Sequence, residues 1–324
     1  MAGNIWVLAE HWRGRLSDLT LELLTLGREL SGGLGAGTAL EAVLLGHGAK
    51  GLAAGLATDG VLSVDHAALA EPNPEAVCAA LASLIEQRKP RALLVPLSNV
   101  AADVLGLLPA RLKISLVNFC RDVRAVDGRL EARCVLYGGK LEATVAVVRE
   151  PAVIGVLPGS RPACAAPAGA PPVTDVAVDL PADLKVRFEQ YIDPEPGDVD
   201  VTQKDVLVSV GRGIQTQDNI ALAEELAAAL GGAVSASRPV IDQGWLPLTR
   251  QVGKSGATVK PKLYLAAGIS GAPEHVEGMK GAALIVAVNT DPQAPIFSVA
   301  HYGYAGDALE FLPALTAAVK ARKT

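Results

Sequence analysis

Short apolar runs alternate with helix-like segments along the first part of the chain. Uninterrupted apolar runs are typical of strands buried on both faces, whereas apolar residues recurring every three or four positions are typical of amphipathic helices. The first pattern occurs at residues 5–9, 42–46, 60–64 and 92–97. The second pattern predicts helices at residues 16–30, 73–88 and 100–112. This alternation predicts a mostly parallel α/β sheet with helices on both of its faces.

The pattern changes after residue 118. The β-type segments that follow are separated in two places by Asp127-Gly128 and Gly138-Gly139, and both dipeptides are hairpin signals. We therefore expect the N-terminal sheet to end in an antiparallel extension. Its expected strands are residues 120–126, 130–136, 141–148 and 152–157. Beyond them, residues 161–172 are rich in Pro and Ala and predict an irregular loop, and residues 174–180 and 185–191 are expected to be extended.

A linker is predicted near residue 193. Positions 193–198 hold two prolines, one glycine and three acids, which is a composition typical of turns and linkers. The length of 324 residues also favours two domains, because single cores stop growing at roughly 250–300 residues. We predict an N-terminal α/β domain at 1–192, a linker at 193–204 and a second domain at 205–324.

The second domain repeats the alternation of strands and helices. Its expected strands are residues 206–211, 233–236, 263–268 and 284–289, and its expected helices are 220–230 and 308–320. Each strand is followed by residues rich in Gly, Ser or Asn. Open parallel sheets bind ligands at the carboxyl ends of their strands. The sequence therefore predicts a ligand site along this edge of the second sheet.

Composition narrows the class of protein. The chain is 50% hydrophobic and 19% charged, with a net charge of −5, which argues against a nucleic-acid partner. Its N-terminus lacks the pattern of a signal or transit peptide, and no uncharged apolar run reaches the roughly 18 residues of a membrane span. We expect a soluble, cytoplasmic protein. The four cysteines form no C-x-x-C pair and are expected to be reduced thiols, and the five histidines lack metal-site spacing.

Three familiar catalytic or nucleotide motifs are incomplete. Gly253-Lys254-Ser255 resembles the end of a P-loop, but Leu248 stands where that motif needs a glycine. Gly211-Arg212-Gly213 follows an expected strand, yet it lacks the third glycine of G-x-G-x-x-G. No G-x-S-x-G elbow is present either, so a hydrolase triad has no support.

Polar residues nevertheless gather at the strand ends of the second domain. One such residue is usually a turn former or a helix cap, but nine along one sheet edge favour a binding site. A long polyhydroxylated anion such as a dinucleotide would satisfy these groups together. The nine residues are Arg212, Ser237, Arg238, Lys254, Ser255, Ser270, His275, Asn289 and Asp307.

At these residues the chain resembles the α subunit of electron-transfer flavoprotein. The motifs follow the order and spacing of that family over about the last 120 residues, whereas the first half resembles it only in length and strand rhythm. The motifs are Gly211-Arg212-Gly213, Ala236-Ser237-Arg238, residues 251–256 (QVGKSG), residues 268–275 (GISGAPEH), residues 287–297 (AVNTDPQAPIF) and residues 302–307 (YGYAGD).

The resemblance implies a flavodoxin-like C-terminal domain that holds one FAD. It implies a heterodimer with a β subunit, which carries AMP or a second FAD. The expected role is that of an electron carrier rather than an enzyme, taking electrons from acyl-CoA dehydrogenase-type flavoenzymes of fatty acid β-oxidation and passing them to a quinone oxidoreductase. Two alternatives stay open. One is a subunit of an electron-bifurcating, NADH-oxidising flavoprotein, and the other is a nucleotide-binding sensor module.

The resemblance also implies which residues contact FAD. Arg212 would bind the diphosphate, Ser237 and Arg238 would lie against the isoalloxazine, and His275 would lie near its pyrimidine ring. Asn289 and Asp307 would bind the adenosine end. The full expected set is Arg212, Ser237, Arg238, Val252, Gly253, Lys254, Ser255, Ser270, Gly271, Ala272, Pro273, Glu274, His275, Asn289, Asp307 and Ala308.

The sequence departs from the family pattern at a few of these positions. Lys254 stands where the family usually has Gln, and Ser255 stands where it often has Thr. Ser255 keeps the hydroxyl group, whereas Lys254 adds a positive charge. Pro273-Glu274 replaces a common Ile-Gln pair, and His301 replaces a common Asp.

Overall fold

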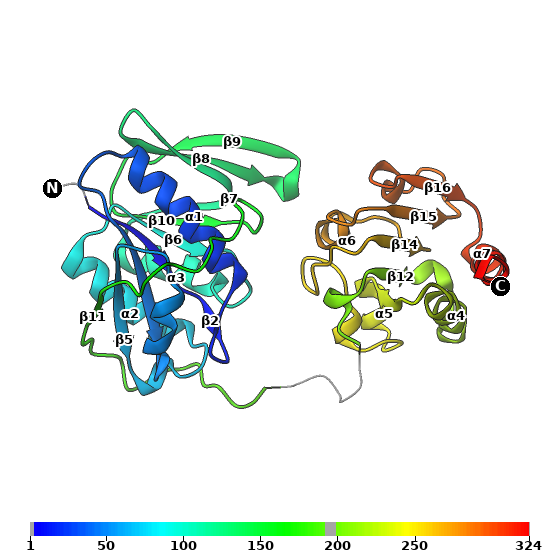
Figure 1. Ribbon diagram of the computed structural model, residues 1–324, viewed down its shortest axis with the longest axis horizontal. Coiled ribbons are helices and arrows are strands. Elements are labelled where there is room, and N and C mark those ends of the chain that lie inside the picture. The colour runs from blue at the N-terminus through cyan, green and yellow to red at the C-terminus, as the bar shows by residue number, and fades with distance from the viewer. Residues whose placement is uncertain (1–2, 192–198, 324) are drawn as a thin grey trace. The chain divides into compact units, whose positions relative to one another are not determined.

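The computed structural model describes residues 3–191 and 199–323. The chain divides into two compact units, Met1–Gln190 and Tyr191–Thr324 (Figure 1). Half of the linker predicted at residues 193–204 lies outside the described residues. Within its second half, Val201–Gln203 form a short 3-10 turn, capped by the Asp200 side chain, which accepts a hydrogen bond from the Thr202 backbone N–H.

The N-terminal unit is built on a nine-stranded sheet of order β11-β5-β4-β1-β6-β10-β7-β8-β9. Every neighbouring pair is parallel except β7–β8 and β8–β9, which form an antiparallel extension at one edge. The prediction of a mostly parallel sheet with an antiparallel extension is confirmed. The strands are β1 (Ile5–Leu8), β4 (Leu40–Gly46), β5 (Gly60–Asp65), β6 (Ala92–Pro96), β7 (Ser115–Val126), β8 (Arg129–Leu136), β9 (Leu141–Ala146), β10 (Ala152–Val156) and β11 (Val173–Asp175).

The structure of this unit differs from the expectations in three places. Residues 152–157 were assigned to the antiparallel extension, but β10 is inserted in parallel between β6 and β7. All five residues of β10 are buried, which is the environment of a central strand and not of an edge. Residues 185–191 form no strand. The small hairpin of β2 (His11–Trp12) and β3 (Arg15–Leu16) was not predicted, because two-residue strands leave no alternation to detect.

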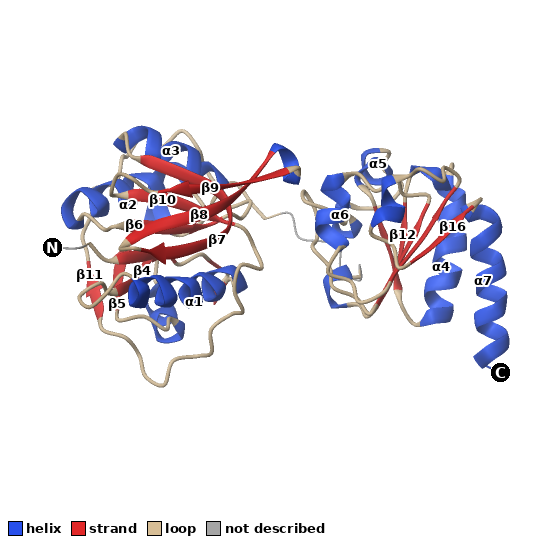
Figure 2. Cartoon of the chain, turned by 90° about the horizontal axis from the view of Figure 1, so that it is seen from above, coloured by secondary structure: helices blue, strands red, loops and turns tan. Residues whose placement is uncertain are grey.

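Helices cover both faces of this sheet (Figure 2). Alternate residues of β1 show the division, because Ile5 and Val7 pack with α1 (Asp18–Gly33), whereas Trp6 and Leu8 pack with α2 (Pro74–Arg88) and α3 (Ala102–Leu112). Helices α1 and α2 each begin at a capping side chain. Ser17 accepts a hydrogen bond from the Thr20 backbone, and Asn73 accepts from the backbones of Glu75 and Ala76.

The C-terminal unit is built on a fully parallel five-stranded sheet of order β13-β12-β14-β15-β16. This is the 2-1-3-4-5 order of flavodoxin-like folds, and it confirms the predicted fold of the second domain. The strands are β12 (Val206–Val210), β13 (Ala233–Ala236), β14 (Leu263–Ala267), β15 (Ile285–Asn289) and β16 (Tyr302–Ala305).

Two layers enclose this sheet. On one face, α4 (Ile220–Leu230) and α7 (Ala308–Lys323) bury Leu226 and Leu312 in a core shared with the strands. The other face is covered by loops and by α6 (Pro273–Met279), which contributes Met279. The short helix α5 (Arg238–Asp242) follows β13 directly. Among the described residues, no helix is long and apolar enough to span a membrane.

Candidate functional site

The carboxyl edge of the C-terminal sheet gathers most of the residues that the sequence singled out. Arg212 follows β12, Ser237 and Arg238 follow β13, and residues 270–275 follow β14. Strands β13 and β14 lie on opposite sides of β12, so the chain changes direction across the sheet at this point. Such a switch point leaves a crevice outside the strand ends, where α/β proteins bind their ligands.

Glycines allow the loops after β12 and β14 to touch through their backbones. A Cβ atom on Gly211 would lie 2.2 Å from the carbonyl oxygen of Gly268, and one on Gly213 would lie 2.7 Å from the Cα of Gly268. Gly268 also has φ +65°, a left-handed conformation that side chains disfavour. The Gly213 N–H donates to the Gly268 carbonyl over 3.0 Å. This contact requires the glycines, and it fixes the two loops that flank the switch point.

The third loop, residues 252–255, is held against both of its neighbours. The Val252 N–H donates to the Ala236 carbonyl over 2.9 Å, and the Lys254 N–H donates to the Glu274 carbonyl over 2.7 Å. The Ser255 hydroxyl accepts from the Gln251 side chain over 3.0 Å. Gln251 belongs to the motif at residues 251–256, but it is not among the predicted site residues. The structure therefore brings the loops after β12 and β14 and the loop at residues 252–255 together at one edge.

Three cations lie at this edge, and their surroundings differ. The Arg212 side chain is exposed and forms no ion pair or hydrogen bond within the described chain. The Arg238 guanidinium lies 3.4 Å from the carboxylate of Asp242, one helical turn along α5, with both side chains more than half exposed. Lys254 is exposed as well. An exposed pair of this kind contributes little energy, so Arg238 remains able to turn to a ligand.

Backbone N–H groups at this edge add further hydrogen-bond donors to those of the three cations. The N–H groups of Ser270, Gly271 and Ala272 have no hydrogen-bond partner in the part of the chain that the structure describes. Ser270 and Ala272 are exposed, as are Pro273 and Glu274, while Gly271 has φ +85° and packs on the backbone of Ile296. Successive free N–H groups and nearby cations suit an anionic group such as a diphosphate.

The residues expected to contact the adenosine end of FAD already form hydrogen bonds within the chain. The Asn289 amide donates to the Ile269 carbonyl over 2.9 Å, and its oxygen accepts from the Asp291 N–H. Asp307 caps α7 by accepting from the Leu309 N–H over 2.8 Å, and Ala308 is buried as the first residue of that helix. These contacts place the groups at the strand ends, and their contact with a cofactor stays a prediction.

His275 differs from the other site residues because its side chain is buried. Its Nε2 lies 2.9 Å from the Tyr264 hydroxyl, and its Nδ1 is buried without a hydrogen-bond partner in the described chain. Burial lowers the pKa of His275 to about 4, against a smaller opposing effect of the Val252 backbone. The imidazole is therefore neutral near pH 7. Ser237 is also buried, and its N–H donates to Val210 at the end of β12.

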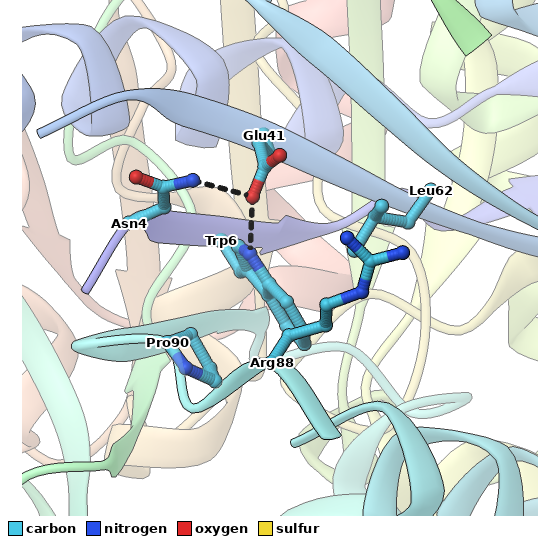
Figure 3. A pocket seen from close by; sticks show the side chains of 6 residues that line it. All are labelled: Asn4, Trp6, Glu41, Leu62, Arg88 and Pro90. Atoms are coloured by element: carbon cyan, nitrogen blue, oxygen red, sulfur yellow. Dashed lines mark hydrogen bonds between the residues drawn. The ribbon is translucent and has the colours of Figure 1, made fainter. Parts of the chain in front are cut away.

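A small pocket in the N-terminal unit shows a different arrangement (Figure 3). Three of its polar side chains are bonded to each other, since one carboxylate oxygen of Glu41 accepts from the Trp6 indole and from the Asn4 amide, both over 2.8 Å. The pocket lies at the amino ends of β1 and β4, opposite the edge at which parallel sheets bind ligands. Leu62, Arg88 and Pro90 also line it.

Two family models match the chain, and together they span both units. The model described as "Electron transfer flavoprotein domain" matches residues 5–181. The model described as "Electron transfer flavoprotein FAD-binding domain" matches residues 200–280. The chain belongs to the electron transfer flavoprotein α-subunit family. The C-terminal unit is accordingly an FAD-binding domain, as the resemblance implied.

Curated relatives agree with this assignment over nearly the whole chain. "Protein FixB" of Clostridium saccharobutylicum is 36% identical over 98% of this chain and 96% of its own length. The electron transfer flavoprotein subunit alpha of Clostridium acetobutylicum is 35% identical over 98% of this chain and 97% of its own length. The "Acryloyl-CoA reductase electron transfer subunit beta" of Anaerotignum propionicum is 35% identical over 99% of this chain and 96% of its own length.

The donor set at the switch point fits FAD chemically. The cofactor carries a diphosphate, for which Arg212 and the free N–H groups of residues 270–272 are suitable partners. Its isoalloxazine gains negative charge on reduction, and the cationic Arg238 and Lys254 lie at the same edge. The structure adds Gln251 and Asp242 to the predicted residues. Their signal in the sequence is weak, because one acts through a side-chain contact within a loop and the other through an i,i+4 pair in a five-residue helix.

Proposed function

We propose that this protein is the FAD-carrying subunit of a heterodimeric electron carrier. It accepts electrons from acyl-CoA dehydrogenase-type flavoenzymes and passes them to a quinone oxidoreductase. The observation that carries the proposal is the set of unsatisfied donors at the switch point of an FAD-binding domain, namely the Arg212 guanidinium and three consecutive backbone N–H groups.

The residues of this chain have distinct tasks in the proposal. FAD supplies the redox chemistry when it is bound. Arg212 and residues 270–272 would hold its diphosphate, while Ser237, Ser255 and the loop at 252–255 would orient the isoalloxazine. Arg238 would stabilise the negative charge that develops on reduction, because a cation close to the ring raises the reduction potential. Lys254 would add a second positive charge at the same edge.

The partner in the proposal is a β subunit of the same flavoprotein family, carrying AMP or a second FAD. Relatives with the names "subunit alpha" and "electron transfer subunit beta" support an assembly of more than one chain. The antiparallel extension offers a suitable surface, because exposed apolar side chains concentrate in and beside β7–β9, and such concentrations mark protein interfaces. These residues are Leu116, Phe119, Val126, Leu136, Tyr137, Leu141, Val145 and Val148.

The decisive experiment is to purify the chain together with its β subunit and to record the absorption spectrum and the nucleotide content. We expect a yellow complex with an FAD spectrum that is bleached by a reduced acyl-CoA dehydrogenase. One FAD and one AMP per heterodimer agree with the simple carrier. Two FADs and reduction by NADH favour the bifurcating alternative. A colourless complex that contains only AMP and takes up no added FAD contradicts the proposal and favours a nucleotide-binding sensor.

A further inference from the structure

The loop that carries Arg212 ends in a strained turn at Gln215. The backbone of Gln215 has φ +74° and ψ −52°, which are the angles of a γ-turn that residues with a Cβ atom rarely adopt. The Thr216 N–H closes this turn by donating to the Ile214 carbonyl over 3.0 Å. Backbone strain of this kind persists only where neighbouring groups impose it.

Asn219 supplies the constraint on this turn. Its side-chain amide donates to the Ile214 carbonyl over 2.9 Å, so this oxygen accepts from both Asn219 and Thr216. Asn219 directly precedes α4, a position at which asparagine commonly caps a helix by accepting from a backbone N–H. Within the described chain its side chain makes no such cap. The amide therefore holds the Gln215 turn and does not begin α4.

The same turn fixes the backbone of Arg212. The Gln215 N–H donates to the Arg212 carbonyl over 3.1 Å. The residue before it, Ile214, is fully buried in the core of the C-terminal unit, and its N–H donates to the Gly211 carbonyl over 3.1 Å. Arg212 thus begins a short 3-10 turn. The glycine contact with the loop after β14 ties this turn at its start, and the strained γ-turn ties it at its end.

We propose that Asn219 is a positioning residue for the FAD site. It acts through the Ile214 carbonyl, because its amide holds Gln215 in the left-handed region and so keeps the Arg212 backbone in place at the switch point. Without the amide, Gln215 relaxes to a negative φ, the hydrogen bond from Thr216 breaks, and the guanidinium starts from a backbone that is no longer fixed. This inference rests on the proposed function, because it assumes that FAD occupies this edge.

The first test is amide hydrogen exchange of the full chain without cofactor, measured by nuclear magnetic resonance. Asn219→Ala should accelerate exchange of the Thr216 N–H by about 2- to 12-fold, which corresponds to the loss of one hydrogen bond. Asn219→Asp should do the same, because a carboxylate has no N–H to donate to the Ile214 carbonyl. Aspartate caps helices as well as asparagine does. If Asn219 merely capped α4, Asn219→Asp would therefore exchange like the wild type.

A rescue variant tests whether Asn219 acts through the strained turn. Glycine adopts positive φ without steric cost, so a turn with glycine at position 215 no longer needs the amide. Gln215→Gly added to Asn219→Ala should therefore slow the exchange of Thr216 again, and an absence of rescue contradicts the proposed route. Gln217→Ala is the matched control. It removes an exposed side-chain amide that has no hydrogen bond among the residues that the structure describes, so exchange at Thr216 should not change.

The cofactor is tested separately by titrating FAD into the same variants. Asn219→Ala and Asn219→Asp should raise the dissociation constant of FAD by about 2- to 12-fold, and added Gln215→Gly should recover part of the loss. Exchange of Thr216 that is the same in wild type and both Asn219 variants overturns the inference, whether or not FAD binds. An unchanged FAD affinity in variants whose exchange is accelerated overturns it as well. The expected exchange in a protein that binds no FAD supports the hold of Asn219 on the turn and contradicts the proposed function instead.

Discussion

The polar side chains at the carboxyl edges of the two sheets differ in how many of them are bonded within the chain. In the N-terminal unit several side chains at this edge bond to one another or to the backbone. The Ser98 hydroxyl bonds the Glu10 carboxylate, the His11 imidazole lies 2.8 Å from the Leu45 carbonyl, and Asp65 accepts from His47. In the C-terminal unit Arg212 and the N–H groups of 270–272 have no partner in the described chain. What distinguishes the C-terminal edge is that Arg212, a cation unpaired within the described chain, lies at the same edge as free backbone donors, which suits an anionic ligand.

Loop chemistry explains the difference. Side chains bridge the strand ends in the N-terminal unit, whereas glycines bring backbone onto backbone in the C-terminal unit. Gly211 and Gly268 leave no room for a side chain between the loops. The exposed donors beside them are consequently free to bind a ligand, and their positions are fixed in advance by the folded backbone. Substitutions at these glycines and donors test the comparison.

The largest effect is expected for Gly271→Ala. A Cβ atom there would lie 2.2 Å from the Ile296 nitrogen, and the residue has φ +85°. The left-handed backbone costs about 1–2 kcal/mol for any side chain. The clash adds about 1–3 kcal/mol, because the loop must move. We expect denaturant unfolding of the C-terminal unit to show this loss of stability, and FAD titration to show weakened binding.

Gly231→Ala is the matched control for this prediction. Gly231 ends α4 with φ +74°, but a Cβ atom there meets nothing within 4 Å. Gly231→Ala should lower stability only by the cost of the left-handed backbone, and FAD binding should not change. Equal stabilities of the two variants would mean that the contact of Gly271 with Ile296 does not shape the loop.

A smaller and more selective effect is expected for Arg212→Ala. Arg212 makes no ion pair within the described chain, so its removal should leave the free energy of unfolding nearly unchanged. A charge-assisted hydrogen bond to the diphosphate contributes about 1.5–3 kcal/mol, which corresponds to a dissociation constant of FAD about 12- to 160-fold higher. Fluorescence titration with FAD measures the change directly.

Arg28→Ala is the control in the N-terminal unit, because this arginine is ion-paired and is not expected to contact FAD. Arg28 lies 2.7 Å from Asp59 in an exposed pair, so its loss should lower stability by at most about 1 kcal/mol. FAD binding should not change. The comparison between the two edges fails if Arg212→Ala destabilises the protein while leaving the FAD affinity intact.

Much of this arrangement could be predicted from local sequence, because buried strands and their glycine-rich ends have strong patterns. The apolar runs at β12 and β14 and the loops after them lie where the sequence indicated. The insertion of β10 between β6 and β7 could not be predicted, since strand order depends on contacts distant in sequence. The burial of His275 was also missed. Its partner Tyr264 lies eleven residues earlier, and only the packing of α6 on the sheet brings the two together.

The smallest expected effect concerns how accessible the cysteine thiols of the N-terminal unit are to a reagent in solution. All four cysteines lie in this unit, and Cys78, Cys120 and Cys134 are buried. The sulfur atoms of Cys120 and Cys134 are 3.7 Å apart, well beyond the roughly 2.05 Å of a disulfide bond, so both are thiols. Burial raises the pKa of Cys78 to about 11 and raises that of Cys120 as well, so few thiolates form near neutral pH.

An aromatic disulfide reagent should therefore modify only the partly exposed Cys164 in the native protein, and all four thiols after denaturation. Burial also raises the pKa of Cys164, so its reaction should accelerate as the pH rises. Cys164→Ser should abolish the native reaction without changing the FAD affinity, because this residue belongs to the closed unit. Fast modification of two or more thiols in the native protein would show that the core of the N-terminal unit opens to the reagent. The buried contacts of this unit would then be weaker than the structure indicates.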